Sequence, residues 1–362
     1  MLINNRSKKI IFPAILLALL LSGITRSVHA EETDIAEITP SPAPVVFERP
    51  NDPYNDALWA YDNLGFFTHY YGTFPVIHYS TADIDMNIWE AWEAYPLTKE
   101  ESRTVIIAII DTGVDYRHPD LTNQMWTNPN EIPDNGIDDD GNGYIDDIYG
   151  WDCVGNDKDP MDDNGHGTHV AGIIAAVNNN GEGISSIAGG SGNGDGVRIM
   201  SVQMFQESLG ADNTRIAAGI EYAADMGAAI LQCSWGQPVM WISDSGYEKN
   251  TGKMLIEAIK YFVECSDNEV MDGGVAIFAA GNEGLEYTSY PGAYNEFISV
   301  SAYAPDGLPT GYTNYHYGCN IAAPGGDFEY VNGVLNPYGA ILSTVPSETP
   351  DVYNNGKTTY GT

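Results

Sequence analysis

Short apolar runs alternate with helical patterns through most of this chain, and this alternation limits the folds that it can adopt. Runs bounded by Gly, Asp or Asn have the length and composition of strands buried on both faces, at 105–110, 197–205, 228–233, 275–280 and 297–302. Helical patterns lie between them at 166–176, 213–226 and 253–264. Strands that alternate with helices form βαβ units. The sequence therefore predicts an α/β fold with a doubly wound, mostly parallel sheet and helices on both faces.

The residues before the first predicted strand divide into three segments of different composition. Residues 1–30 have a basic start, an apolar run too short to span a membrane and a small-residue cleavage site at 28–30, as in a secretory signal peptide. Residues 31–50 are acidic and Pro-rich, as in an extended linker. Residues 51–103 are rich in Trp, Tyr and Phe, and we expect them to pack on the main domain at 104–362. The sequence predicts a secreted, extracytoplasmic protein.

The charge balance excludes some classes of partner. Asp and Glu number 50 against 15 Lys and Arg, which gives a net charge of −35, and removal of residues 1–30 would take away basic residues only. A chain this acidic repels nucleic acid and anionic membranes and attracts cations. We therefore expect no nucleic-acid partner, and no membrane partner once the signal peptide is cleaved.

The cysteines leave two alternatives open. In an oxidising compartment Cys153, Cys233, Cys265 and Cys319 can form two disulfides, in a pairing that the sequence does not specify. Cys233 lies in an apolar run and is explained equally well as a buried small hydrophobe. The chain has no Cys-x-x-Cys pair, which argues against a zinc site.

Three separate motifs place polar side chains beside the predicted elements. Asp111 ends the first apolar run, where open α/β sheets place their sites, and its carboxylate can fix the tautomer of a histidine. His166 and His169 stand at the start of a helix of small residues that can lie close to neighbouring backbone. The spacing alone does not show which of them is a base. Asn282, in Gly-Asn-Glu-Gly after the fourth run, would by itself indicate a turn.

Together and in this order, the motifs resemble those of the subtilisin-like serine peptidases, the subtilase family. The Asp-Thr-Gly block begins at Asp111, and the His-Gly-Thr-His-Val-Ala-Gly block begins at His166. The resemblance implies a subtilisin-like fold in which Asp111 orients His166 and His166 is the general base. It makes His169 structural, and it makes Asn282 the donor that stabilises the oxyanion of the tetrahedral intermediate.

The resemblance also covers a substrate-binding edge and the last residues of the chain. Ser234, Trp235 and Gly236 match the family's edge, whose backbone pairs with an extended peptide as an added strand. In the family a nucleophilic serine follows the Gly-Thr pair found here at Gly361 and Thr362. The implied function is a secreted, monomeric serine endopeptidase that hydrolyses protein or peptide substrates by acyl transfer.

The position of Thr362 leads to a further expectation about the polypeptide as given. It would lack the nucleophile and the C-terminal part of the fold, and would therefore be inactive. A second interpretation is a naturally truncated pseudoprotease that binds peptides or calcium. The presence of Asp111, His166 and Asn282 together favours the peptidase, because a dead protein would have no need to retain them.

An acidic loop between the first two motifs predicts a structural Ca²⁺ site. With Asp138 as position 1, oxygen ligands fall at positions 3, 5, 7 and 9, as in an EF-hand loop. The candidate ligands are Asp138, Asp140, Asn142, Tyr144 through its backbone carbonyl, Asp146 and Asp147. Position 12 is Tyr149 rather than a bidentate Glu, so Asp147 or a residue outside the loop would complete the shell. The alternative is a solvated acidic turn without a metal.

Overall fold

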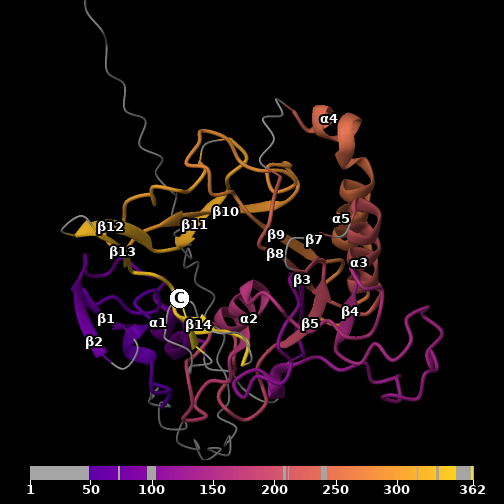
Figure 1. Ribbon diagram of the computed structural model, residues 1–362, viewed down its shortest axis with the longest axis horizontal. Coiled ribbons are helices and arrows are strands. Elements are labelled where there is room, and N and C mark those ends of the chain that lie inside the picture. The colour runs from indigo at the N-terminus through magenta and orange to yellow at the C-terminus, as the bar shows by residue number, and fades with distance from the viewer. Residues whose placement is uncertain are drawn as a thin grey trace, which may run out of the picture. The chain divides into compact units, whose positions relative to one another are not determined.

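A seven-stranded sheet is the main feature of the fold, and its strands lie in the order β11, β10, β9, β8, β3, β5, β4 (Figure 1). The computed structural model describes residues 49–71, 74–95, 103–206, 209–210, 212–237, 243–315, 317–331, 334–347 and 360–361. The predicted signal peptide (1–30), residues 31–48 of the predicted linker and Thr362 lie outside these residues.

All neighbouring strands of this sheet run parallel. In chain order they are β3 (Ile106–Asp111), β4 (Gly150–Asp152), β5 (Arg198–Gln203), β8 (Ile230–Cys233), β9 (Val275–Ala279), β10 (Ile298–Tyr303) and β11 (Ile321–Pro324). The five predicted runs correspond to β3, β5, β8, β9 and β10. The two outermost strands, β4 and β11, were not predicted because they are only three and four residues long.

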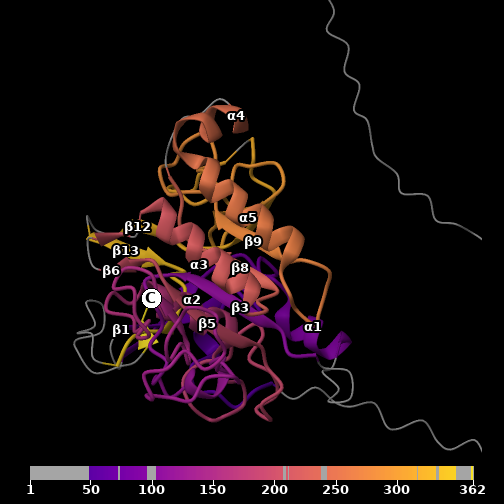
Figure 2. The same ribbon diagram turned by 90° about the vertical axis from the view of Figure 1, so that its right-hand side faces the viewer.

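Helices cover both faces of the sheet (Figure 1). They are α2 (His166–Ala175), α3 (Asn213–Asp225) and α5 (Lys253–Cys265), as predicted to within one residue at each end. The side chains of β3 alternate between the two faces, with Ile107 and Ile109 in one cluster with residues of α2. Ala108 and Ile110 belong to a second cluster with residues of α3 and α5, which lie together in Figure 2. The predicted α/β fold with a parallel sheet and helices on both faces is confirmed.

The remaining elements are short and lie outside the main sheet. They are η1 (Asn55–Ala57), β1 (Phe66–Tyr71), β2 (Phe74–Tyr79), α1 (Ile88–Ala94), η2 (Thr122–Gln124), β6 (Phe205–Gln206), β7 (Leu209–Gly210), α4 (Asp244–Tyr247), η3 (Glu248–Gly252), β12 (Asp327–Val331), β13 (Val334–Tyr338), β14 (Ser343–Thr344) and β15 (Tyr360–Gly361). Within the described ranges, no helix has both the length and the apolar character needed to cross a membrane.

The aromatic segment that precedes β3 packs on the rest of the domain. Trp59 is 2% exposed, and its indole Nε1 donates a hydrogen bond to the Gly339 carbonyl at 2.8 Å. The hydroxyl of Tyr61 donates to the Ser185 carbonyl at 3.2 Å. These two hydrogen bonds join this segment to the loops that follow α2 and β13.

All four cysteines are free thiols. Cys153 and Cys233 are buried in the hydrophobic cluster between the sheet and α3 and α5, whereas Cys265 is exposed and Cys319 is partly buried. The possibility of two disulfides is thus not realised, and Cys233 takes the alternative of a buried small hydrophobe. Burial also raises the pKa of the Cys233 thiol well above its ordinary value, which makes this thiol unreactive.

Candidate active site

Asp111 and His166 meet at the carboxyl end of β3. Asp111 is the last residue of β3 and is 1% exposed, whereas His166 is the first residue of α2 and its side chain is 53% exposed. The His166 Nδ1 atom lies 2.6 Å from Asp111 Oδ1. The two residues are 55 positions apart in the chain and form one hydrogen-bonded pair. Only the outer part of the imidazole faces solvent.

A glycine allows the start of α2 to approach the end of β3 so closely. A Cβ atom on Gly167 would lie 2.1 Å from the Gly113 carbonyl oxygen and 3.3 Å from the Asp111 Cβ. Any side chain at position 167 would therefore push the helix, and His166 with it, away from Asp111. This close contact explains why glycine follows His166 in the motif.

Asp162, which was not among the site residues predicted from the sequence, connects the end of β3 to the start of α2. Its Oδ1 accepts a hydrogen bond from the Thr112 hydroxyl at 2.9 Å, and its Oδ2 accepts one from the Thr168 backbone N–H at 2.9 Å. The first contact reaches the residue after Asp111, and the second reaches the first turn of α2. An acidic residue just ahead of a helix start is the signal that points to such a contact.

The Asp111 carboxylate sets the chemistry of His166. The hydrogen bond to Asp111 raises the pKa of His166 above its ordinary value, against the lowering effect of burial. Nδ1 is occupied by this bond, which leaves Nε2 as the atom that can accept a proton from a nucleophile. Asp111 Oδ1 also accepts the Thr112 backbone N–H at 2.8 Å, which fixes the carboxylate in its plane. The pair is built to hold an imidazole in one tautomer.

His169, the other histidine of the motif, has a different environment. Its Nε2 lies 3.1 Å from the Ile341 carbonyl oxygen, on the side of α2 that faces β14. The structure therefore pairs Asp111 with His166 and gives His169 a packing contact, an alternative that the spacing alone had left open.

Asn282 stands in the loop that follows β9, two strands away from β3 along the same edge of the sheet. Its side chain is exposed, as a group that meets a substrate must be. The preceding residue, Gly281, has a φ of +111°, a backbone conformation that favours glycine. The loop therefore turns sharply between the end of β9 and Asn282.

Ser234, Trp235 and Gly236 directly follow β8, the strand between β3 and β9. The Trp235 indole turns toward the sheet, where its Nε1 donates to the Ile110 carbonyl at 2.8 Å and its ring packs edge-on against Phe278 at 5.6 Å. Gly236 is exposed. This segment thus lies between the Asp111–His166 pair and the Asn282 loop in strand order, with its tryptophan as a fixed anchor rather than a free side chain.

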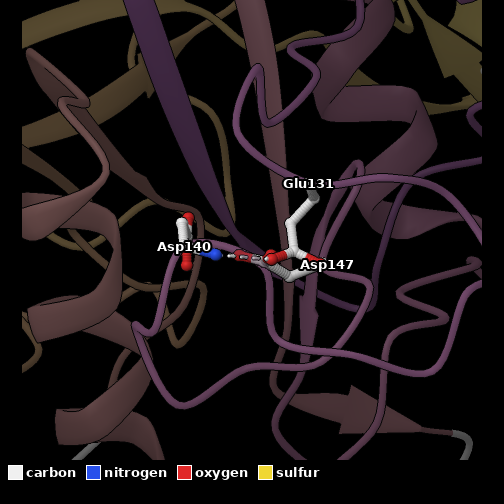
Figure 3. Close-up of side chains that lie close together, drawn as sticks. All are labelled: Glu131, Asp140 and Asp147. Carbon is white, nitrogen blue, oxygen red and sulfur yellow. Dashed lines mark hydrogen bonds between the residues drawn. The ribbon is translucent and has the colours of Figure 1, made fainter.

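The acidic loop forms a smaller cluster than the sequence predicted, and it includes a residue from outside the loop. Carboxylate oxygens of Asp140, Asp147 and Glu131 lie within 4.8 Å of one another (Figure 3). Two unit charges about 4 Å apart repel by about 4 kcal/mol at an effective dielectric constant near 20, so these groups favour a cation between them. Burial raises the pKa of Asp147 above its ordinary value. Glu131 lies seven residues before Asp138, and an isolated acid that near to an acidic loop was the available signal.

The other predicted ligands face different partners. Asp138 accepts the backbone N–H groups of Gly141 at 2.7 Å and Gly143 at 2.8 Å, so it closes the turn. Asp146 forms an ion pair with Lys158, at 3.2 Å between Oδ2 and Nζ.

Two amide side chains lie against the cluster itself. Asn142 Nδ2 donates to Asp147 Oδ2 at 3.2 Å, and Asn128 Nδ2 donates to Asp140 Oδ2 and to Asp147 Oδ1, both at 3.0 Å. Tyr144 follows Asn142 and packs edge-on against Tyr222. Asn142 therefore lies beside the cluster, as the loop pattern predicted, whereas Asn128 is an addition from outside the loop.

The fold and the site together define a class of protein. A parallel α/β sheet presents an Asp–His pair, an open backbone segment and an exposed asparagine along one edge, which is the arrangement of a hydrolase that activates a hydroxyl nucleophile. Comparisons with known proteins agree. The model of the subtilase family matches residues 102–362, and the chain belongs to this family.

Individual relatives cover different shares of the chain. Thermitase from Thermoactinomyces vulgaris is 33% identical over 246 residues, which are 68% of this chain and 71% of thermitase. Halolysin from Haloferax mediterranei is 32% identical over 244 residues, which are 66% of this chain but 38% of halolysin. The solved serine protease of Aeromonas sobria aligns with a TM-score of 0.62 at 18% identity, over 86% of this chain and 51% of that one, and shows the same fold.

Proposed function

We propose that this chain forms the catalytic domain of a secreted serine endopeptidase that cleaves peptide bonds by acyl transfer. The observation that supports it most directly is the hydrogen bond between Asp111 and His166 at the edge of the sheet. His166 Nε2 takes the proton of a serine hydroxyl as the oxygen attacks the peptide carbonyl, and later gives it to the leaving amine. Asp111 stabilises the imidazolium that forms. The Asn282 amide donates to the oxyanion.

The family pattern Gly-Thr-Ser assigns the nucleophile to a serine directly after Thr362. The residues just before that point support the assignment. Strand β15 (Tyr360–Gly361) pairs with β14, and the Thr344 hydroxyl of β14 donates to the Thr168 carbonyl at 2.7 Å. Since Thr168 lies in the first turn of α2, the chain at Gly361 runs one strand away from the helix that begins with His166.

The test is covalent labelling of the protein made from its gene with every residue that the gene encodes after codon 362. A fluorophosphonate probe is expected to label the wild-type protein and to label a His166→Ala variant far more slowly. Absence of labelling in a folded wild-type protein, or a stop codon after Thr362, would contradict the proposal. Either result would favour the pseudoprotease interpretation, in which the same edge binds peptides without cleaving them.

The segment Ser234–Gly236 is the proposed binding edge for the substrate backbone. It extends past the end of β8, and its neighbour Gln237 is already fixed by paired backbone hydrogen bonds to Tyr290, at 2.7 and 3.2 Å. A rigid extended segment can add a substrate strand with little loss of conformational freedom. We expect protein and peptide substrates, bound by a monomeric enzyme, which size-exclusion chromatography with light scattering would check.

Calcium is the proposed ligand of the acidic cluster, with Glu131, Asp140 and Asp147 as its carboxylates. Hard oxygen ligands of this kind suit Ca²⁺. The ion would offset the mutual repulsion of the carboxylates and stabilise the loop. Chelation at constant ionic strength is expected to lower the melting temperature, and an unchanged melting temperature would contradict this proposal.

Secretion rests on the pattern of residues 1–30. Cleavage after Ala30 would leave Glu31 as the first residue. N-terminal sequencing of protein recovered from the medium of the source organism is expected to begin at Glu31. Recovery of the protein in the cell fraction with residues 1–30 intact would contradict secretion.

A further inference from the structure

One buried side chain makes most of its hydrogen bonds to the loop that contains Asn282. Asn314 is fully buried, at 0% exposure, and follows β10 in the chain. Its Oδ1 accepts the backbone N–H groups of Glu283 at 3.2 Å and Leu285 at 3.0 Å. Its Nδ2 donates to the Ala280 carbonyl at 3.2 Å and to Glu283 Oε2 at 2.6 Å. A single amide thus spans the loop from its first residue to its end.

The backbone of Asn314 adds a hydrogen bond directly before Asn282. Its N–H donates to the Gly281 carbonyl at 3.0 Å. The peptide group before Asn282 is therefore fixed through its carbonyl, and the peptide group after Asn282 is fixed through the Glu283 N–H. Because both flanking peptide planes are anchored to the same residue, the backbone dihedrals of Asn282 have little freedom. The side chain of Asn282 itself remains exposed.

The fit between Asn314 and the loop is tight. A Cβ atom built on Gly281 would lie 2.3 Å from Asn314 Nδ2. The loop can therefore lie against Asn314 only with glycine at position 281, apart from the positive φ that this position also requires. Two independent constraints, one on the backbone and one on the side chains, thus favour one geometry for Asn282.

We infer that Asn314 is a positioning residue for catalysis, which acts through Asn282 by holding the loop Ala280–Leu285 in the geometry that stabilises the oxyanion. The inference rests on the proposed function, since it assigns Asn314 to the site of that reaction. An oxyanion donor is effective only if it is fixed before charge develops, because reorganisation during the reaction costs part of the stabilisation. A fully buried amide with bonds on both sides of the donor supplies that rigidity.

The chain offers a control at the amino end of β9, the strand whose carboxyl end leads into the loop that contains Asn282. Asn268 lies between α5 and β9, accepts the N–H groups of Val270 and Met271, both at 3.0 Å, and donates to the Gly273 carbonyl at 2.7 Å. It clamps a loop in the same way as Asn314 does, but at the amino end of β9, away from the catalytic edge. Asn268 is partly buried whereas Asn314 is fully buried, so the two substitutions are compared in kcat rather than in stability.

The experiment compares Asn314→Ala with Asn268→Ala in the protein encoded by the complete gene. We expect Asn314→Ala to lower kcat about 10- to 100-fold with KM little changed, because a misplaced donor affects the transition state more than the ground state. Asn268→Ala is expected to lower the melting temperature with kcat almost unchanged. Equal effects of the two substitutions on kcat would overturn the inference.

A double-mutant cycle tests whether Asn314 acts through Asn282. In an Asn282→Ala background, Asn314→Ala should cost only a small further factor in kcat, because the donor that it positions is already gone. Full additivity of the two losses would contradict the inference. If the wild-type protein neither cleaves peptides nor reacts with a fluorophosphonate, the proposed function fails first, and the role of Asn314 fails with it. Active wild type with additive losses overturns the inference alone.

An exchange of hydrogen-bonding roles provides a second variant if Asn314→Ala does not fold. Asn314→Asp keeps the acceptor for Glu283 and Leu285 but loses the donor to the Ala280 carbonyl and sets a carboxylate against Glu283, so kcat should fall. Adding Glu283→Gln restores a donor–acceptor pair with the roles reversed, although the bond to Ala280 stays lost. We expect the double variant to recover part of the loss in kcat relative to Asn314→Asp, measured against Glu283→Gln alone. No recovery in a folded double variant would contradict the role of this contact.

Discussion

The side chains of Asp111 and His166 are 55 residues apart in the chain and lie 2.6 Å from each other, whereas Asp138 and Asp140 are only two residues apart, and only Asp140 belongs to the carboxylate cluster with Glu131 and Asp147. The first two side chains belong to the end of a buried strand and the start of a helix. The other two belong to an irregular loop. Regular elements fix the relative positions of side chains that are far apart in the sequence. An irregular loop can turn two side chains that are close in the sequence toward different surroundings.

The difference has a physical cause in how each backbone is fixed. The positions of β3 and α2 are set by ladder hydrogen bonds, helix hydrogen bonds and a shared apolar core. In the acidic loop, side-chain oxygens accept most of the local hydrogen bonds. The orientation of each carboxylate therefore depends on which N–H groups or cations lie near it. Asp138 accepts an N–H group of its own turn, and Asp146 forms an ion pair with Lys158. Glu131, from outside the loop, lies close to Asp140 and Asp147.

The largest expected effect comes from the catalytic pair. Asp111→Asn keeps the shape of the side chain but favours the wrong histidine tautomer, so kcat should fall by about 10⁴-fold, the loss typical of an Asp–His–Ser triad without its carboxylate. Asp163→Asn, at an exposed position three residues before His166, serves as the control and should leave kcat unchanged. Steady-state kinetics on a chromogenic peptide measures both. A loss below tenfold for Asp111→Asn would remove the catalytic meaning of the pair.

A substitution at Asn282 tests whether a loop attached to a strand end holds its side chain in a fixed position, as the Asp111–His166 pair is held, or leaves it variable, as in the acidic loop. Asn282→Ala should lower kcat by about 10²- to 10³-fold, since it removes one oxyanion donor. Asn193→Ala, at an exposed position in another loop, should have no measurable effect. The same peptide assay gives the result. If kcat stays the same while KM rises, Asn282 binds the substrate in its ground state rather than the oxyanion.

Calcium affinity tests the division within the acidic loop. Glu131→Gln should weaken Ca²⁺ binding by at least about 10-fold, because it removes a charged oxygen ligand from the cluster. Asp138→Asn should weaken it much less, because Asp138 is not one of the three carboxylates that lie within 4.8 Å of one another. Isothermal titration calorimetry with Ca²⁺ compares the two. A larger effect at Asp138 than at Glu131 would favour the EF-hand-like ligand set predicted from the sequence.

The smallest expected effect is a displacement of the pH profile. His166 must be neutral to accept a proton, and its hydrogen bond to Asp111 raises its pKa above the ordinary value of 6.5. Activity should therefore be full at higher pH and should be lost as the pH falls through this raised pKa, which puts the acid limb of kcat/KM above pH 6.5. The profile of Glu131→Gln, measured with saturating Ca²⁺, should have the same limb. An acid limb below pH 6.5 would show that Asp111 does not raise the pKa of His166.

The amino-acid sequence by itself determined the parts that depend on periodicity and on the ends of regular elements. The apolar runs and helical patterns predicted five of the seven strands and all three long helices, because burial on both faces leaves a pattern in the residues themselves. The positions of Asp111, His166 and Asn282 followed from those element ends and from the family resemblance. The edge of the sheet that carries these three residues was thus predicted before any contact was known.

Only the tertiary structure decided contacts between side chains that the backbone pattern does not order. It brought Glu131, rather than Asp138 or Asp146, together with Asp140 and Asp147, and it left the four cysteines unpaired. It also revealed Asp162 and Asn314, whose partners lie in other segments. Such contacts depend on distances across the fold, and a distance across the fold follows from the packing of all the elements rather than from any one stretch of sequence.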